Sequence, residues 1–150
     1  SRRLQGPFPL HFLSAFSNRK LINSSKEGWG MYMAVRAVRG AITVENNSAL
    51  DILDATKTLL NKIVDENKID TCDIISILFS VTKDLNTVFP AAAARQLGWT
   101  SIALMCVNEI DVPDGLKRCI RILMHFNTEK GNKDIKHIYL KGAKALRPDL

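Results

Sequence analysis

The sequence contains little cysteine and no long hydrophobic run, and each absence excludes a class of protein. Its three cysteines, Cys72, Cys106 and Cys119, are an odd number without CxxC pairing. This argues against both a disulfide framework and a zinc site. A reducing compartment is the simplest setting for such a chain, so we expect a cytoplasmic protein. No segment approaches the run of about 18 apolar residues that a transmembrane helix needs, so no membrane association is expected.

Motifs for cofactors, phosphates, metals and activated nucleophiles are also missing from the sequence. It has no GxGxxG, GxxxxGK[ST], GxSxG or HExxH motif, and no histidine–cysteine cluster at metal-ligand spacing. His11, His125 and His137 stand alone, as structural histidines usually do. Cys106 has no base partner near it in the sequence, which favours a buried thiol over a nucleophile. The sequence therefore predicts neither a metal nor a cofactor.

The composition is otherwise that of an ordinary globular domain with a basic charge. The 150 residues are 46% hydrophobic and 24% charged, with a net charge of +6. These values exclude collagen-like, mucin-like and fully disordered chains. A chain of this length buries about two thirds of its unfolded surface and needs no disulfide or metal to fold. The positive charge leaves open nucleic acid, a membrane surface or a small anion as a partner.

Most of the excess charge lies in the first 30 residues. They hold five basic residues and one acidic residue, a net of +4, whereas residues 31–150 carry a net of +2. Such a block can be an organellar transit peptide, a basic arm for a polyanion, or a leader ahead of the natural start. We favour the leader, because Lys26-Glu27-Gly28 can be encoded by a purine-rich ribosome-binding sequence shortly before Met31. Residues 31–150 are then the expected domain.

The rest of the chain follows the order β-α-β-α-β-β-β. The predicted strands are 33–44, 74–81, 101–107, 116–127 and 138–140; the predicted helices follow the capping residues 46–48 to about 67 and span 87–97, with a helical turn at 142–146. This order predicts an α/β (α+β) domain with one mixed β-sheet and helices on one face. The segment 74–81 is apolar on both sides, so we expect self-association to bury the uncovered face.

Arginines beside apolar strand residues are the feature that points to a binding site. Arg39, Arg121 and Arg147 lie in three separate elements, and each can also be read as a solvated or ion-paired surface residue. If they converge, they form an anion pocket, because a guanidinium binds a carboxylate through two hydrogen bonds. Gly40, next to the first of them, indicates either a bulge or a close backbone approach. Composition and spacing alone indicate no more than a soluble α/β domain.

Four segments, in order and with near-identical spacing, resemble one family. They are VRAVRGAITVE, VFPAAAAR, CVNEIDVPDGLKRCIR, and HIYL followed by LRPDL. Over residues 33–150 the chain resembles the monofunctional AroH-class chorismate mutases of the Bacillus subtilis type. The resemblance implies a trimeric pseudo-α/β-barrel with active sites between subunits. It also implies an isomerase of the shikimate pathway that rearranges chorismate to prephenate, toward phenylalanine and tyrosine, without a cofactor or a covalent intermediate.

The resemblance implies roles for ten residues. Arg121 would lie against the ether oxygen and a carboxylate of the substrate, and Arg39 would clamp a carboxylate. Tyr139 would donate a hydrogen bond to a carboxylate, whereas Glu109 and the Cys106 backbone would hold the ring hydroxyl. The others would form an apolar wall and a basic mouth: Phe89 with Ala91 and Leu146 beside it, and Arg95 with Arg147.

Two departures and two rival functions accompany this resemblance. The family often has a lysine where this chain has Ala92, and relatives commonly carry a tail beyond the position of Leu150. Weaker capture of chorismate and a reduced closing role of the tail are therefore expected. The first rival is a non-catalytic trimeric protein that binds a small carboxylate. The second is a nucleic-acid binder using the basic N-terminus; the domain lacks a recognition helix or basic stripe, so no nucleic-acid partner is expected.

Overall fold

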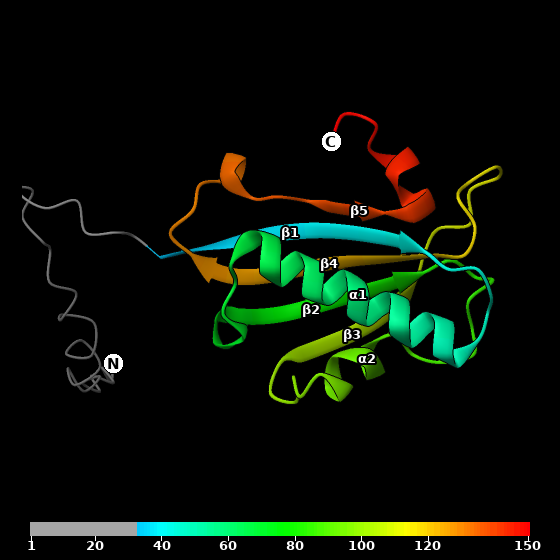
Figure 1. Cartoon of the computed structure of the whole chain (residues 1–150), viewed down its shortest axis with the longest axis horizontal. Helices are drawn as coiled ribbons and strands as arrows, with labels where there is room; N and C mark the ends of the chain where they lie inside the picture. Colours follow the sequence, from blue (N-terminus) through cyan, green and yellow to red (C-terminus); the bar gives the residue numbers. More distant parts are fainter. Residues whose placement is uncertain (1–32) are drawn as a thin grey trace, which may run out of the picture. The chain divides into compact units, whose positions relative to one another are not determined.

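The computed structural model describes residues 33–150, and the leader expected at 1–30 lies outside the described residues. The main elements follow the predicted order (Figure 1). The strands are β1 (Ala34–Thr43), β2 (Ile74–Val81), β3 (Ala103–Asn108), β4 (Cys119–Thr128) and β5 (Ile138–Leu140); the α-helices are α1 (Ala49–Asn67) and α2 (Ala91–Gln96); the 3₁₀ turns are η1 (Thr71–Asp73), η2 (Asn132–Asp134) and η3 (Lys141–Leu146). Within residues 33–150, no helix combines the length and apolar character that crossing a membrane requires.

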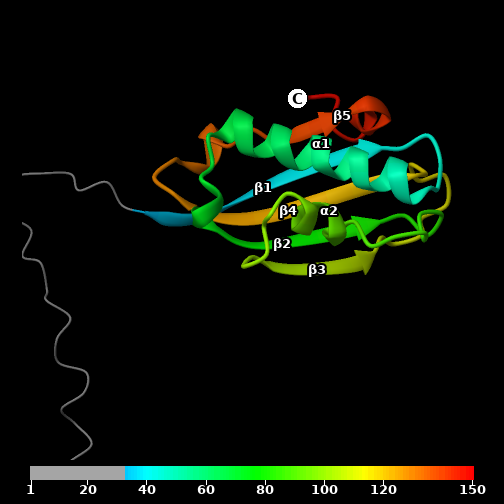
Figure 2. The same cartoon turned by 60° about the horizontal axis from the view of Figure 1, so that its bottom comes forward.

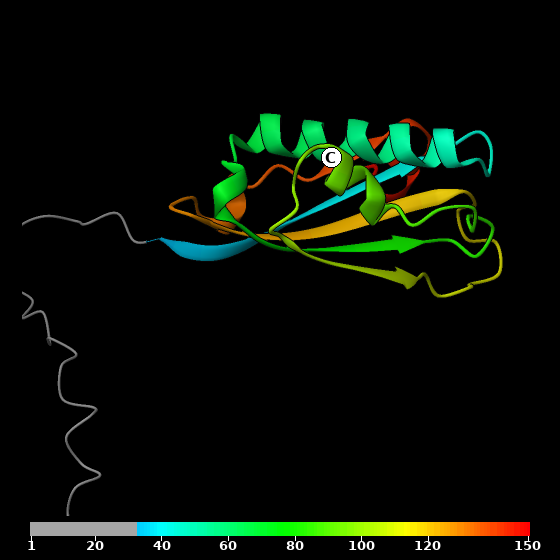
Figure 3. The ribbon, with the colours of Figure 1, turned by 90° about the horizontal axis from the view of Figure 1, so that it is seen from below.

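The five strands form one mixed sheet in the order β3-β2-β4-β1-β5. Strand β4 runs antiparallel to β1 and β2, whereas β3 pairs in parallel with β2 and β5 in parallel with β1. Both α-helices lie on the same face of this sheet (Figure 2, Figure 3). The structure thus confirms the predicted mixed sheet with helices on one face.

The hydrophobic core fills the space between α1 and the covered face of the sheet. Because side chains alternate along a strand, every second residue of the central strands points into this layer. The fully buried strand residues there are Val38, Ile42, Ile77, Phe79, Ile120, Ile122, Met124 and Phe126, and those of α1 are Ile52, Leu59, Leu60 and Ile63. The side chains between them in sequence therefore project from the other face, which we call the uncovered face.

Gly40 lies in β1 directly beneath α1. A Cβ atom at this position would stand 2.7 Å from Cδ1 of Ile63 and 3.3 Å from the carbonyl oxygen of Ile138. The pairing of β1 with β4 continues through Gly40 without a register shift. Of the two expectations for this glycine, the close approach is confirmed and the bulge is wrong. The missing side chain lets helix, β1 and β5 pack closely behind Arg39.

Two predicted elements begin three or four residues later than expected. The strand predicted from Leu116 begins at Cys119, because Arg118 has a left-handed backbone with φ of 48° and its N–H donates to Asp84 Oδ2 at 2.9 Å. The helix predicted from Thr87 begins at Ala91, with Pro90 as its N-cap. Proline is accepted at a helix start, since its ring supplies no N–H for a helical hydrogen bond. Both changes lengthen the loops beside the candidate site.

Candidate active site

A row of residues across four strands brings predicted site residues together on the uncovered face. Arg121 of β4 lies opposite Ser80 of β2 on one side and opposite Ala41 of β1 on the other. Ala41 in turn lies opposite Tyr139 of β5. Residues opposite each other project to the same face, so Arg121 and Tyr139 flank the small side chain of Ala41. Arg39 projects to this face too, because it precedes Ala41 by two residues.

Glu109 is held beside Arg121 by contacts to two strands. Its backbone N–H donates to the carbonyl oxygen of Val81 at 2.8 Å, which fixes the chain just after β3. One carboxylate oxygen lies 2.9 Å from Nη1 of Arg121. The other accepts a hydrogen bond from the Ser80 hydroxyl at 2.5 Å. The ion pair lies in a pocket of about 650 Å³ bounded by the loop at 110–117, and both side chains are only 24% exposed.

Arg121 keeps one hydrogen-bond donor without an acceptor. Its Nε is buried and has no partner, which is true of no other buried side-chain nitrogen or oxygen of residues 33–150. A buried donor without an acceptor costs about 1–3 kcal/mol. An oxygen atom of a ligand at this position would remove that cost. Glu109 therefore orients the guanidinium, and the chain itself supplies no acceptor for Nε.

Further positive charge gathers on the β5 side of the row. The guanidinium of Arg39 is exposed, and the ion pairs found within residues 33–150 do not include it. Arg147, just after η3, lines a pocket together with Tyr139. Leu146 packs with Tyr139 against the buried Ala41. Four predicted residues thus meet at this end of the row, with the cations on its solvent side.

Asp149 compensates much of the charge on Arg147. Its two carboxylate oxygens lie 2.8 Å from Nε and 2.7 Å from Nη2 of Arg147. The hydrogen bond with Asp149 raises the pKa of Arg147, and the same contact lowers the pKa of Asp149 to about 2. Arg147 is therefore already bound to a carboxylate of its own chain. Arg39 is the more available cation of the two.

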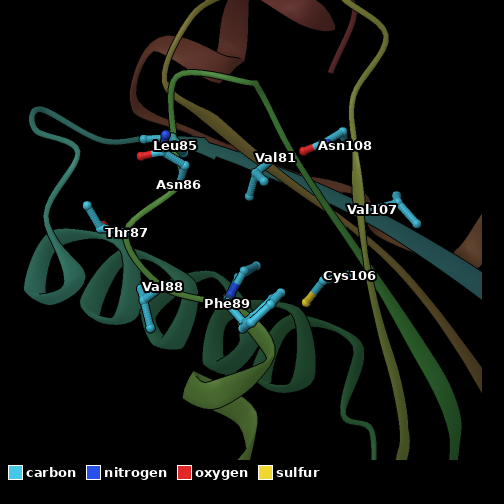
Figure 4. Close-up of a pocket in the computed structure, with 10 residues that line it drawn as sticks. Val81, Leu85, Asn86, Thr87, Val88, Phe89, Cys106, Val107 and Asn108 are labelled. Carbon is cyan, nitrogen blue, oxygen red and sulfur yellow. The ribbon is translucent and has the colours of Figure 1, made fainter.

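The remaining predicted residues lie on the helical side of the sheet, near its β3 edge. Phe89 and Cys106 line a pocket of about 490 Å³, where the Cys106 thiol and the Val107 side chain point in opposite directions (Figure 4). Phe89 is 74% exposed despite its apolar ring. Ala91 is buried at the start of α2, and Arg95 is exposed in its last turn. A single chain therefore does not bring this group together with the Arg121 row.

Sequence reasoning missed Ser80. The run 74–81 is so apolar that it predicts a buried strand, and this pattern does not indicate a functional role for a serine within it. Its partner Glu109 is 29 residues away in the sequence. The available signal was the pair of hydroxyls, Ser76 and Ser80, spaced so that both project from the same side of an otherwise apolar strand. Only the pairing of β2 with β4 shows that the second one faces Arg121.

The arrangement can bind an anion and stabilise negative charge that develops during a reaction. Within residues 33–150, no three side chains of His, Cys, Asp or Glu are grouped to hold a metal ion. The site instead offers a guanidinium oriented by a carboxylate, a second exposed guanidinium and the Tyr139 hydroxyl. Fixed donors of this kind are suited to a substrate with carboxylates and to charge that grows in a transition state.

His137 makes the stability of this end of the sheet dependent on pH. Burial lowers the pKa of His137 from its usual 6.5, and the charges of Arg147 and Arg39 lower it further. Its Nδ1 also accepts the backbone N–H of Arg39 at 3.0 Å, which requires the unprotonated nitrogen. The folded state thus favours neutral imidazole, and the stabilisation is complete above pH 6.5 and declines as the pH falls below it.

We expect the free energy of unfolding to fall between pH 7.5 and pH 5.5, and His137→Asn to reduce that fall. Asparagine can still accept the Arg39 N–H but takes up no proton. We would measure the free energy of unfolding by urea denaturation at a fixed protein concentration. The measurement compares its fall between the two pH values in the wild type and in the variant. An equal fall in both proteins would show that His137 does not contribute to it.

The chain is similar to known proteins over most of its length. Residues 35–150 match the sequence family described as chorismate mutase type I. Chorismate mutase AroH of Bacillus subtilis is 45% identical over 119 residues, which cover 79% of this chain and 94% of that protein. Chorismate mutase AroH of Thermus thermophilus is 43% identical over 117 residues, covering 77% and 96%. The structure of a chorismate mutase from Clostridium thermocellum aligns with a TM-score of 0.73 at 57% identity, over 73% of this chain and 98% of that one.

Proposed function

Because this chain belongs to the chorismate mutase type I family, we propose that its active site is built around Arg121 on the uncovered face of the sheet. The protein is a chorismate mutase, an isomerase of aromatic amino acid biosynthesis that rearranges chorismate to prephenate. The observation that carries the proposed site is the unpartnered Nε of Arg121, oriented by the ion pair with Glu109. The rival carboxylate binder without catalysis is not favoured.

The rearrangement requires stabilisation of charge in the transition state and no proton transfer. One C–O bond breaks while a C–C bond forms, and negative charge builds on the ether oxygen in the transition state. A fixed cation beside that oxygen binds the transition state more tightly than the ground state. Arg121 fits this role because its guanidinium is held by Glu109 before substrate arrives. Arginine also keeps its charge at every pH of interest, so the donor is always present.

The neighbouring donors would hold the substrate in its reactive shape. Chorismate is flexible and carries two carboxylates, and it reacts only when its enolpyruvyl arm folds over the ring. We propose that Arg39 and Tyr139 bind carboxylates, and that Glu109 and the Cys106 backbone hold the ring hydroxyl. Fixing the folded conformer removes part of the entropic barrier. Arg147 would add attraction for the dianion once its pairing with Asp149 loosens.

We propose that a neighbouring subunit completes each active site in a homotrimer. Phe89 is highly exposed and, with Ala91 and Arg95, lies on the far side of the sheet from Arg121. The uncovered face also carries exposed apolar side chains, with Val35 at 56% and Met105 at 61%. Copies packed through this face would bury those side chains. They could also bring the Phe89 group of one subunit to the Arg121 row of the next.

A chorismate absorbance assay together with the native mass tests this function. We expect the purified protein to consume chorismate without added metal or coenzyme, at the mass of a trimer. A fully active monomer would contradict the shared site. Tight binding of prephenate without turnover would instead favour the non-catalytic carboxylate binder.

Three sequence-based expectations extend the proposal. We propose that residues 31–150 are the catalytic domain, with 1–30 as a leader outside it, and that the enzyme works in the cytoplasm. Ala92 lies in α2 between the buried Ala91 and Ala93 and supplies no cation at the proposed mouth. Weaker electrostatic capture of chorismate than in relatives with lysine at this position follows from that substitution.

A further inference from the structure

We propose that Ser80 is a positioning residue for the rearrangement, acting through Glu109 to aim the guanidinium of Arg121. This rests on the proposed function of the site. Ser80 lies in β2 directly opposite Arg121 in β4, on the uncovered face. Its hydroxyl donates to one oxygen of Glu109 at 2.5 Å, while the other oxygen lies 2.9 Å from Nη1 of Arg121. The carboxylate is thus held at both oxygens by two residues of one cross-strand pair.

The backbone alone does not fix the direction of this carboxylate. The hydrogen bond from the Glu109 N–H to Val81 fixes the main chain, but the terminal torsion of a glutamate side chain is broad and weakly restrained. With the Ser80 hydroxyl in place, only one oxygen faces Arg121. Without it, the carboxylate can rotate, and the guanidinium loses the partner that determines where Nε points.

A change in the orientation of the Arg121 guanidinium should lower kcat more than it raises KM. The guanidinium of Arg121 is the cation proposed to lie beside the ether oxygen, where negative charge develops in the transition state. Carboxylate capture by Arg39 and Tyr139 does not depend on Ser80. A residue that acts only in strand packing would lower stability and leave kcat unchanged. The ratio of the change in kcat to the change in KM therefore distinguishes positioning from packing.

Ser76 provides a matched control. It lies in the same strand, and its register partner His125 is on the same face as Arg121. Its hydroxyl is also engaged, at 3.2 Å from Nδ1 of His125. Ser76→Ala therefore removes a hydroxyl from the same strand and face without touching Glu109 or Arg121.

The first experiment measures chorismate turnover by four variants at the native mass of the wild type. We expect Ser80→Ala to lower kcat about tenfold, the usual scale for one lost hydrogen bond to a charged group, with KM little changed. Ser80→Thr should recover most of the loss, because it retains the hydroxyl, and Ser76→Ala should behave as wild type. Ser80→Cys, a weak donor of similar size, should fall between Ser80→Ala and wild type, and it replaces Ser80→Ala if that variant does not fold.

The second experiment repeats Ser80→Ala in a Glu109→Ala background. If Ser80 acts through Glu109, the substitution has no further effect once the carboxylate is gone. An equal loss in both backgrounds would overturn the proposal, as would equal behaviour of Ser80→Ala and Ser76→Ala. If the wild type itself fails to turn over chorismate, the proposed function falls first. If the wild type is active but Ser80→Ala keeps full kcat, only the role of Ser80 is lost.

Discussion

Replacing Arg121 by alanine should lower kcat about a hundredfold or more, the scale usually found when one donor to developing charge is removed. The substitution removes the buried Nε that has no partner in the chain. It also leaves Glu109 half-buried without its cation, in a pocket proposed to receive an anion. Both effects raise the energy of a transition state that carries negative charge on the ether oxygen.

Steady-state kinetics on chorismate, with native mass as a check of assembly, measures this loss. Arg118→Ala is the matched control, because Arg118 is three residues away, is exposed and donates to the carbonyl of Glu45 rather than to the site. We expect the control to retain most of its activity. Arg121→Lys should recover only part of the rate. A lysine ammonium lacks the planar set of N–H donors with which a guanidinium can bind Glu109 and the ligand at the same time. Near-wild-type turnover by Arg121→Ala would remove Arg121 from the mechanism.

Replacing Arg39 by alanine should lower kcat/KM about thirtyfold, mainly through KM. Its guanidinium is exposed and projects beside Arg121 and Tyr139, with its backbone held by His137. A charged donor to a carboxylate that is bound both before and during the reaction strengthens ground-state and transition-state binding together. Losing such a contact costs about 2 kcal/mol, which corresponds to the expected change in kcat/KM.

Arg36→Ala is the control for this substitution. Arg36 is in the same strand but lies opposite the buried Phe126, on the covered face, and its Nε donates to the carbonyl of Lys130 at 3.0 Å. Substrate titrations should therefore give a higher KM for Arg39→Ala than for Arg36→Ala. A KM for Arg39→Ala equal to that of Arg36→Ala would show that Arg39 does not bind substrate. A loss confined to kcat would show that Arg39 acts on the reacting bond and does not bind a carboxylate.

The order of the elements could be predicted because hydrophobic periodicity and turn residues act locally. The strand at 138–140 has the expected bounds, and α1 ends at the expected Asn67. The start of β4 was harder to predict, because it depends on a tertiary contact between Asp84 and the backbone of Arg118. The alternating hydrophobic pattern of the sequence continues through the position of such a contact and does not reveal it.

The sequence by itself determined the class of the domain, because composition and periodicity are properties of the chain alone. Its motifs also showed a resemblance to one family, and that resemblance implied roles for ten candidate residues. Only the tertiary structure decided which of them meet. The β1–β4–β2 register places Ser80, Arg121 and Ala41 in one row, although they are distant in sequence. Phe89, in the loop before α2, lies on the other side of the sheet. A strand's register is set by packing over many residues, and a single-residue slip would turn Arg121 into the core.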